Sequence, residues 1–282
     1  MRIFNLFELE KEIQVMDIGA AAIAEVPVYK ILCEKMMAHL TVFDGDVRQI
    51  EKIESIYGRD NVSVFNCFVF DGKKQQVYLC SPQSGMTSIF KPNIKSLNFF
   101  NGFNRFGRVE RTDEVHTTKL DDIKGVKPPD FLKMDVQGAE LGILENGSRT
   151  LKDCLAIQLE VSFFPLYEKQ PSFGAVDIHM RSKGFVPHCF KGVKRWSIAP
   201  TIFKNNFRIP GNQLLESDII YVKDPLKIDE LNDIQLKKLT VLAHYSFESY
   251  DYCIFLILEM ERRGLLNAGS HKVYTKTFNE IQ

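Results

Sequence analysis

Two acidic residues at the ends of apolar segments are the clearest sign of chemistry in this sequence. Asp135 follows an apolar stretch within residues 131–136, and Glu160 lies near the end of a second one, 155–161. Segments of this kind predict buried strands, and ligands of open α/β sheets bind outside the carboxyl ends of the strands. Both acids are therefore expected at a ligand site, although an Asp before a helix often serves only as its cap.

An earlier segment, 13–20, is also predicted to be a strand that ends in an acid, Asp17. Gly19 and Ala20 follow, and such small residues let the backbone approach a ligand closely. No second or third Gly follows Gly19, so the GxGxxG fingerprint of dinucleotide-binding proteins is missing. This turn therefore indicates a close approach to some ligand without identifying a nicotinamide cofactor.

Asp44 ends the second predicted strand, 39–44. An acid at this position binds the two ribose hydroxyls in many α/β nucleotide sites. Asp46 fits the alternative role of capping the next predicted helix, 47–57, which leaves Asp44 for the ribose.

The remaining pattern alternates strands with helices, which predicts a mostly parallel sheet with helices on both faces. Residues 81–88 are polar and lack a helical period, and residues 91–107 are rich in Asn, Phe and Gly. We expect these two segments to flank the cleft, either as a mobile cover or as irregular connections. The other expected strands are 61–70, 76–80, 108–118, 185–190 and 218–222, the expected helices are 139–151 and 172–183, and residues 191–210 are expected to be a loop.

Composition narrows the class of protein. The chain has 282 residues, 45% hydrophobic content, and 36 basic and 36 acidic residues, which is typical of a globular protein with no net charge. A balanced charge does not favour nucleic acid or an anionic membrane surface as the main partner. Six scattered cysteines without a CxxC pair, an acid close to the N-terminus and the lack of a membrane-length apolar run predict a cytoplasmic protein with no membrane span.

The central stretch 131–140, Phe-Leu-Lys-Met-Asp-Val-Gln-Gly-Ala-Glu, resembles the signature of the FkbM-type S-adenosylmethionine-dependent methyltransferases. Gln137 stands where Glu is more common in that family. The resemblance extends from about residue 13 to residue 222. It implies a Rossmann-like seven-stranded methyltransferase sheet, mostly parallel, with helices on both faces. We accordingly divide the chain into a methyltransferase domain, 1–222, and a C-terminal helical extension, 223–282.

The resemblance also implies a set of site residues and the cofactor S-adenosylmethionine. Asp135 would lie beside the transferred methyl group and the acceptor. The residues implied to bind the cofactor are Asp17, Gly19 and Ala20 on the methionine side, Asp44 at the ribose, and Asn66, Cys67 and Phe68 near the adenine.

A hydroxyl acceptor must lose a proton, so a general base is needed. Asp135 and Glu160 are the main candidates, and three histidines remain open. Glu160 could instead pair with Lys133, or the two acids could share a hard divalent cation. We expect no metal, because the sequence offers no evident third ligand. The histidines in question are His116, His179 and His188.

These observations predict an O-methyltransferase that acts on a hydroxyl of a polyhydroxylated acceptor. Sugars of surface polysaccharides or glycosylated natural products are the acceptors that the resemblance implies. The partner is then a small molecule or a glycan, not a nucleic acid. Two other hypotheses remain: a non-catalytic nucleoside-binding Rossmann-like module, which fits the missing glycines after Gly19, and a nicotinamide-dependent oxidoreductase, which the missing fingerprint disfavours.

The segment 226–266 has a helical pattern and is predicted to form two helices broken near Ser249. Residues 252–258 are apolar without interruption, so a helix there should be buried on more than one face. We expect this extension to pack on the core domain or on a second copy of the chain in a homodimer.

Overall fold

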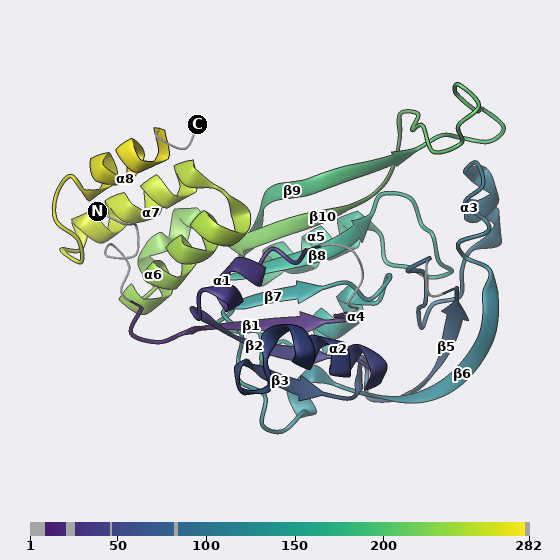
Figure 1. The fold of residues 1–282 in the computed structure, drawn as a ribbon, viewed down its shortest axis with the longest axis horizontal. Coiled ribbons are helices and arrows are strands. Elements are labelled where there is room, and N and C mark those ends of the chain that lie inside the picture. The colour runs from purple at the N-terminus through teal and green to yellow at the C-terminus, as the bar shows by residue number, and fades with distance from the viewer. Residues whose placement is uncertain (1–8, 21–25, 46, 82–83, 280–282) are drawn as a thin grey trace.

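The computed structural model describes residues 9–20, 26–45, 47–81 and 84–279, and its centre is a seven-stranded sheet in the order β3-β2-β1-β7-β8-β10-β9 (Figure 1). The five strands from β3 to β8 pair in parallel, and β10 is antiparallel to both of its neighbours. The predicted mostly parallel Rossmann-like sheet is confirmed. Its strands are β1 Ile13–Ile18, β2 Ala38–Phe43, β3 Val62–Phe65, β7 Phe131–Met134, β8 Ala156–Ser162, β9 Phe185–Trp196 and β10 Gln213–Lys223.

Helices cover both faces of this sheet, as the alternating pattern predicted. On one face, apolar side chains of the sheet share a core with α1, α2, α6 and α7. On the other face they pack against α4 and α5. The helices are α1 Lys30–Glu34, α2 Val47–Tyr57, α4 Glu140–Glu145, α5 Phe173–Ser182, α6 Asp233–Leu242 and α7 Tyr250–Arg262, with short 3-10 helices at Arg59–Asn61, Leu120–Asp122 and Pro225–Glu230.

A second, three-stranded sheet lies beyond the carboxyl ends of the parallel strands (Figure 1). It consists of β4 Phe68–Val69, β5 Lys74–Cys80 and β6 Val109–Thr118, so the single strand expected over 61–70 is in fact two strands in different sheets. The segment 91–107 also differs from expectation, since it contains a helix, α3 Ile94–Phe99. Asn93 begins this helix, because its side chain accepts hydrogen bonds from the N–H groups of Lys95 and Ser96.

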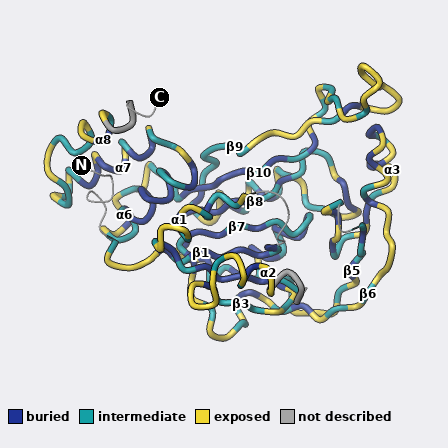
Figure 2. Tube along the Cα trace, in the orientation of Figure 1, coloured by how far each residue is buried: buried dark blue, intermediate teal, exposed yellow. Residues whose placement is uncertain are grey.

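An aromatic cluster fills the space between α3 and the main sheet. Leu97 and Phe100 are buried there together with Leu166 and Tyr167 from the loop after β8, and Trp196 at the end of β9 packs on them. Strands β9 and β10 continue well past the ranges expected from sequence, and residues predicted to be loop therefore lie on a projecting hairpin. Figure 2 shows that the end of this hairpin is exposed.

The C-terminal helices pack on the amino-terminal half of the sheet. A π-helix, Ala243–Phe247, continues α6, and the chain breaks at Glu248, whose φ is 56°, before α7 begins. The predicted break near Ser249 thus has a structural counterpart, and α8 Ser270–Asn279 follows. The sequence predicted that α7 is buried on more than one face. Its buried residues include Tyr252, Cys253, Leu256, Ile257 and Met260, whereas Phe255 and Leu258 are 39% and 45% exposed, so one side of the helix faces solvent.

The fold does not test every prediction made from the sequence. A domain boundary after residue 222 and a homodimer stay predictions. All six cysteines are free thiols. Among the described residues, no helix is long and apolar enough to cross a membrane.

Candidate active site

One face of the sheet changes from apolar to polar toward the carboxyl ends of its strands. Asp17 on β1 lies opposite Lys133 on β7, and Lys133 lies opposite Gln158 on β8. Glu160, two residues farther along β8, pairs in register with Asp218 of β10. Side chains two residues apart in a strand share a face, so these groups form one polar zone across four neighbouring strands.

The turn after β7 is held by a buried carboxylate that the sequence analysis did not single out. Oε1 of Glu140 accepts hydrogen bonds from the N–H groups of Val136 and Gly138, at 3.1 and 3.2 Å. Burial raises the pKa of Glu140 to about 7. Gln137, within this turn, has a φ of 55°, a conformation that is uncommon outside glycine. The turn therefore points the Gln137 side chain in a direction that an ordinary extended backbone would not allow.

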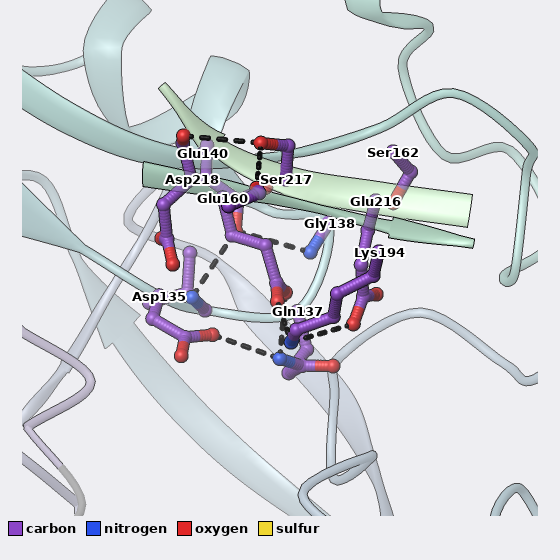
Figure 3. A network of polar contacts seen from close by, with 12 residues as sticks. Asp135, Gln137, Gly138, Glu140, Glu160, Ser162, Lys194, Glu216, Ser217 and Asp218 are labelled. Carbon is purple, nitrogen blue, oxygen red and sulfur yellow. Dashed lines mark hydrogen bonds and ion pairs between the residues drawn. The ribbon is translucent and has the colours of Figure 1, made fainter. Parts of the chain in front are cut away.

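Gln137 joins the two acids that were predicted to be catalytic (Figure 3). Its Nε2 donates one hydrogen bond to Oδ1 of Asp135 and another to Oε2 of Glu160, both at 2.8 Å. The other end of the amide, Oε1, accepts a 2.7 Å hydrogen bond from the Tyr167 hydroxyl. All three bonds together fix the orientation of the amide. The nitrogen occupies the position between the carboxylates that a shared cation would need.

Glu160 is a buried acid in an acidic environment. Its Oε1 lies 3.7 Å from Nζ of Lys194, which lies closer, at 2.9 Å, to Oε1 of Glu216. Burial raises the pKa of Glu160 well above its usual range, and the charges of Asp135 and Glu216 raise it further, whereas Lys194 opposes the shift. When ionised, Glu160 is therefore a stronger base than an ordinary carboxylate.

Asp17 is engaged inside the protein. Its Oδ2 accepts a 2.5 Å hydrogen bond from the Tyr29 hydroxyl, and its Oδ1 lies 3.7 Å from Nζ of Lys133. Lys133 therefore forms its ion pair with Asp17. The lysine beside Glu160 is Lys194 from β9, so the alternative that Glu160 pairs with Lys133 is wrong. Burial lowers the pKa of Lys133, but the negative charges of Asp17 and Asp135 outweigh this effect and keep that pKa above its usual value.

The residues expected at the methionine side lie at one tight junction. Gly19 has a φ of 82°, and a Cβ there would come within 2.1 Å of the carbonyl oxygen of Asp135. Ala20 next to it is buried. Only a glycine allows the ends of β1 and β7 to come this close, so the turn after β1 brings the Asp17 strand directly beside Asp135.

The residues expected at the ribose and adenine lie together after β2 and β3. Nδ2 of Asn66 donates a 3.0 Å hydrogen bond to the carbonyl oxygen of Asp44. The ring of Phe68 lies against Gly45, where a Cβ would approach it to 2.2 Å. Cys67 differs from this group, because its half-buried thiol packs on the core beneath the sheet.

Residues 84–90 contact the turn that carries Gln137, whereas the sequence predicted only that this segment flanks the cleft. The Ser88 hydroxyl donates a 2.7 Å hydrogen bond to the carbonyl oxygen of Gln137. The Tyr167 hydroxyl lies 3.4 Å from the carbonyl oxygen of Met86. Residues 82 and 83, also in the expected polar loop, lie outside the described residues. The described part of this loop thus supports the turn that carries Gln137.

The three histidines considered as bases lie elsewhere. His116 is exposed on β6, opposite Lys74. His179 is on α5, and the Nε2 of His188 lies 2.6 Å from the Ser249 hydroxyl at the start of α7. Within the described residues, none of them is hydrogen-bonded or ion-paired to Asp135 or Glu160.

Comparison with known proteins places the chain in a family. Residues 30–187 match the model of the methyltransferase FkbM domain, which is more than half of the chain. No curated protein matches the sequence.

Solved structures with similar folds are distant. Magnesium protoporphyrin IX methyltransferase from Synechocystis PCC 6803, solved with bound SAM, is 9% identical with a TM-score of 0.37, over 76% of this chain and 71% of that one. A TehB-like SAM-dependent methyltransferase from Corynebacterium glutamicum is 11% identical with a TM-score of 0.35, over 76% and 82%. An uncharacterized protein from Listeria monocytogenes is 11% identical with a TM-score of 0.37, over 94% and 91%.

Proposed function

Because the chain belongs to the FkbM methyltransferase family, we propose that it transfers a methyl group to a hydroxyl of a polyhydroxylated acceptor. The protein is a methyltransferase, and its cofactor is S-adenosylmethionine. The acceptor and the roles of single residues are our proposal. The observation that carries it is the pair of acids, Asp135 and Glu160, held together by Gln137 at the carboxyl ends of β7 and β8.

The residues at the strand ends fit the cofactor by their chemistry. S-adenosylmethionine supplies an electrophilic methyl group on a positively charged sulfur, and it carries a ribose diol and an adenine ring. The carboxylate of Asp135 suits the positive charge. Asp44 suits the diol, and the exposed Phe68 ring suits the adenine. We propose these three contacts, with Gly19 and Ala20 at the methionine side and Asp17 acting there through Lys133.

Glu160 is the group that we assign to accept the proton of the acceptor hydroxyl. Burial and its acidic neighbours make it a strong base once ionised, and Lys194 stands beside it to balance the charge. Proton transfer of this kind contributes about 10²–10⁴-fold to the rate. Asp135 shares the same donor, Gln137, and keeps its Oδ2 clear of hydrogen-bond donors among the described residues. It orients reactants, and orientation is itself a large contribution.

The surroundings of Glu160 support a sugar-like acceptor. Half-buried rings of Phe90, Phe164 and Trp196 belong to the aromatic cluster that also contains Tyr167. The Tyr167 hydroxyl donates a hydrogen bond to Gln137, so this aromatic cluster lies directly beside the two acids that Gln137 joins. Sugars present both hydroxyls and apolar C–H faces, and a site of acids beside aromatic rings matches both.

The test is the release of S-adenosylhomocysteine with a panel of free sugars, methyl glycosides and sugar nucleotides. Each active acceptor is compared with the analogue in which one hydroxyl is replaced by hydrogen. We expect release and an O-methylated product with at least one sugar, abolished in one deoxy analogue. Transfer to amine acceptors, with none to any hydroxyl, would contradict the proposal. A cytoplasmic location and a surface polysaccharide or a glycosylated natural product as the source of the sugar belong to the same proposal.

A further inference from the structure

The hairpin that projects from the main sheet has an unusual charge. We define the arm as residues 190–214, the end of β9, the loop and the start of β10. It contains five Lys or Arg residues and no Asp or Glu, in a chain whose basic and acidic residues are equal in number. Residues 91–109, which pack against the arm, contain four more basic residues and no acid. The zero net charge of the chain therefore conceals a basic region on one side of the site.

The arm also exposes apolar side chains. Of the eighteen large hydrophobic residues that are exposed in the described part of the chain, six lie in these 25 residues. Near its tip Ile202 is 54% exposed and Phe203 is 42% exposed, beside the exposed Lys204 and Arg208. Figure 2 shows this end of the hairpin as exposed and remote from the C-terminal helices α6, α7 and α8. Apolar residues gathered in this way mark an interaction surface.

A buried polar clasp holds the arm in this position. Nδ2 of Asn101 donates hydrogen bonds to the hydroxyl of Ser197 and to the carbonyl oxygens of Ile198 and Thr201. The backbone carbonyl oxygen of Asn101 accepts a 2.9 Å hydrogen bond from the Trp196 indole. The Arg105 guanidinium lies 4.1 Å from the centre of the Phe207 ring. The fold therefore fixes the base of the arm and leaves its apolar tip in solvent.

We propose that the arm binds an anionic membrane surface. Aliphatic side chains such as Ile198 and Ile202 gain from insertion among lipid tails, and cations beside them are attracted to acidic headgroups. Nucleic acid is bound by stacking of its bases on aromatic rings, whereas four of the six exposed large hydrophobic residues of the arm are aliphatic. Lys194 of the arm forms an ion pair with Glu216, which lies just beyond the arm on β10, so binding brings the site close to the membrane surface. This proposal does not depend on the nature of the acceptor.

Flotation of the full chain with vesicles tests the proposal. We expect binding to vesicles of phosphatidylcholine with roughly one third phosphatidylglycerol, weak binding to phosphatidylcholine alone, and a loss of binding as salt rises. The double variants Ile202→Ser/Phe203→Ser and Lys204→Glu/Arg208→Glu should each weaken binding at least about tenfold. Both should keep the melting temperature and the affinity for S-adenosylmethionine of the wild type.

The chain offers matched controls. Ile178 and Leu226 are 72% and 92% exposed on other surfaces, and Lys124 and Lys127 are exposed lysines away from the arm. Ile178→Ser/Leu226→Ser and Lys124→Glu/Lys127→Glu should bind vesicles as the wild type does. The proposal is overturned if the wild type does not bind the anionic vesicles, if the controls weaken binding as much as the arm variants, or if single-stranded RNA binds the arm and displaces the vesicles.

Discussion

Two acid–lysine pairs lie at opposite ends of the central strands, and they differ in how completely the acid is satisfied. Lys238 of the first pair is buried, whereas Lys194 of the second is half exposed. At the amino end of β7, Oδ2 of Asp130 lies 2.6 Å from Nζ of Lys238 on α6 and also accepts a 2.7 Å hydrogen bond from the N–H of Gln14. At the carboxyl end of β8, Glu160 lies 3.7 Å from a lysine that is closer to Glu216. Asp130 thus has a lysine and a backbone N–H as close partners, whereas Glu160 has to share Lys194 with Glu216.

The two pairs also differ in what covers them. The amino-terminal pair is enclosed by α6, which with α7 covers the apolar half of the sheet face. The carboxyl-terminal pair borders the aromatic cluster and the projecting hairpin. A buried charge without a full set of partners is costly, and such groups are concentrated at functional sites. From this comparison we propose that Asp130 contributes to stability and that Glu160 takes part in the chemistry.

The largest effect should come from Glu160→Gln, which keeps the shape of the side chain and removes its basicity. We expect turnover to fall by about 10²–10⁴-fold. The variant should fold at least as well as the wild type, because a buried charge is removed. Turnover with the identified acceptor and thermal melting measure the two effects.

Asp135→Asn is the matched variant for Glu160→Gln, since Asn can still accept the hydrogen bond from Gln137. If Asp135→Asn alone abolishes turnover, then Asp135 is the base and Glu160 holds it in place. If both variants are inactive and a chelator also silences the wild type, the two acids hold a cation. Unchanged turnover in both variants would show that the active site lies elsewhere in the protein.

The opposite outcome is expected at the amino-terminal pair. Asp130→Ala should cost about 3–5 kcal/mol of unfolding free energy, because it leaves the Lys238 charge buried without its partner. Urea denaturation measures the loss, and the folded fraction should turn over normally. In the double variant Asp130→Ala/Lys238→Met much of the loss should be recovered; if it is not, the pair does not act as a unit.

This comparison also shows where sequence reasoning succeeded. The sheet could be predicted because apolar segments alternate with helical ones, and because Asp44 and Asp135 follow strands and Glu160 lies near the end of one. Family membership adds the cofactor. The partner of Glu160 could not be predicted, since it depends on strand register: Lys133 lies opposite Asp17 and Gln158, two residues short of Glu160.

Other parts of the site were missed for similar reasons. Helix α3 has only six residues in an Asn- and Phe-rich segment, too few for a helical period to be visible. Lys194 and Glu216 lie on strands whose exposed ends have a polar, loop-like composition. Glu140 looked like an ordinary residue of the first helical turn, and only its burial shows that it holds the turn carrying Gln137.

Asp44→Ala extends the comparison to the cofactor end of the sheet. A carboxylate that binds both ribose hydroxyls contributes hydrogen bonds of about 1.5–3 kcal/mol each. We expect the affinity for S-adenosylmethionine in titration calorimetry to fall by roughly tenfold or more, with the melting temperature unchanged. Equal affinity would reject the ribose assignment, and Asp60→Ala, which removes an exposed acid outside the site, is the control.

Gln137→Met should have a smaller effect that separates positioning from direct catalysis. The thioether fills a similar volume but donates nothing to Asp135 and Glu160, so the two carboxylates repel each other and the pKa of Glu160 rises further. The acid limb of the pH profile of kcat should then move to higher pH, with a loss of at least about fivefold at neutral pH, because the hydrogen bonds to both carboxylates are lost. Gln137→Glu should shift the limb in the same direction. A profile that keeps its midpoint would show that Gln137 only packs.

The smallest effect concerns Glu140, whose pKa burial raises to about 7. A carboxyl with a raised pKa in the folded state gives stability that is complete below its unfolded value, about 4.3, and is lost as the pH rises through about 7. Glu140→Gln keeps the oxygen that accepts from Val136 and Gly138 but cannot ionise. Between about pH 6 and pH 8 the wild type should therefore lose roughly 1 kcal/mol of unfolding free energy relative to this variant. Urea denaturation at the two pH values measures the difference. Glu145→Gln, on the exposed end of the same helix, should follow the wild type, and if Glu140→Gln does so too, then Glu140 is ionised at an ordinary pH and holds the turn as a charged group.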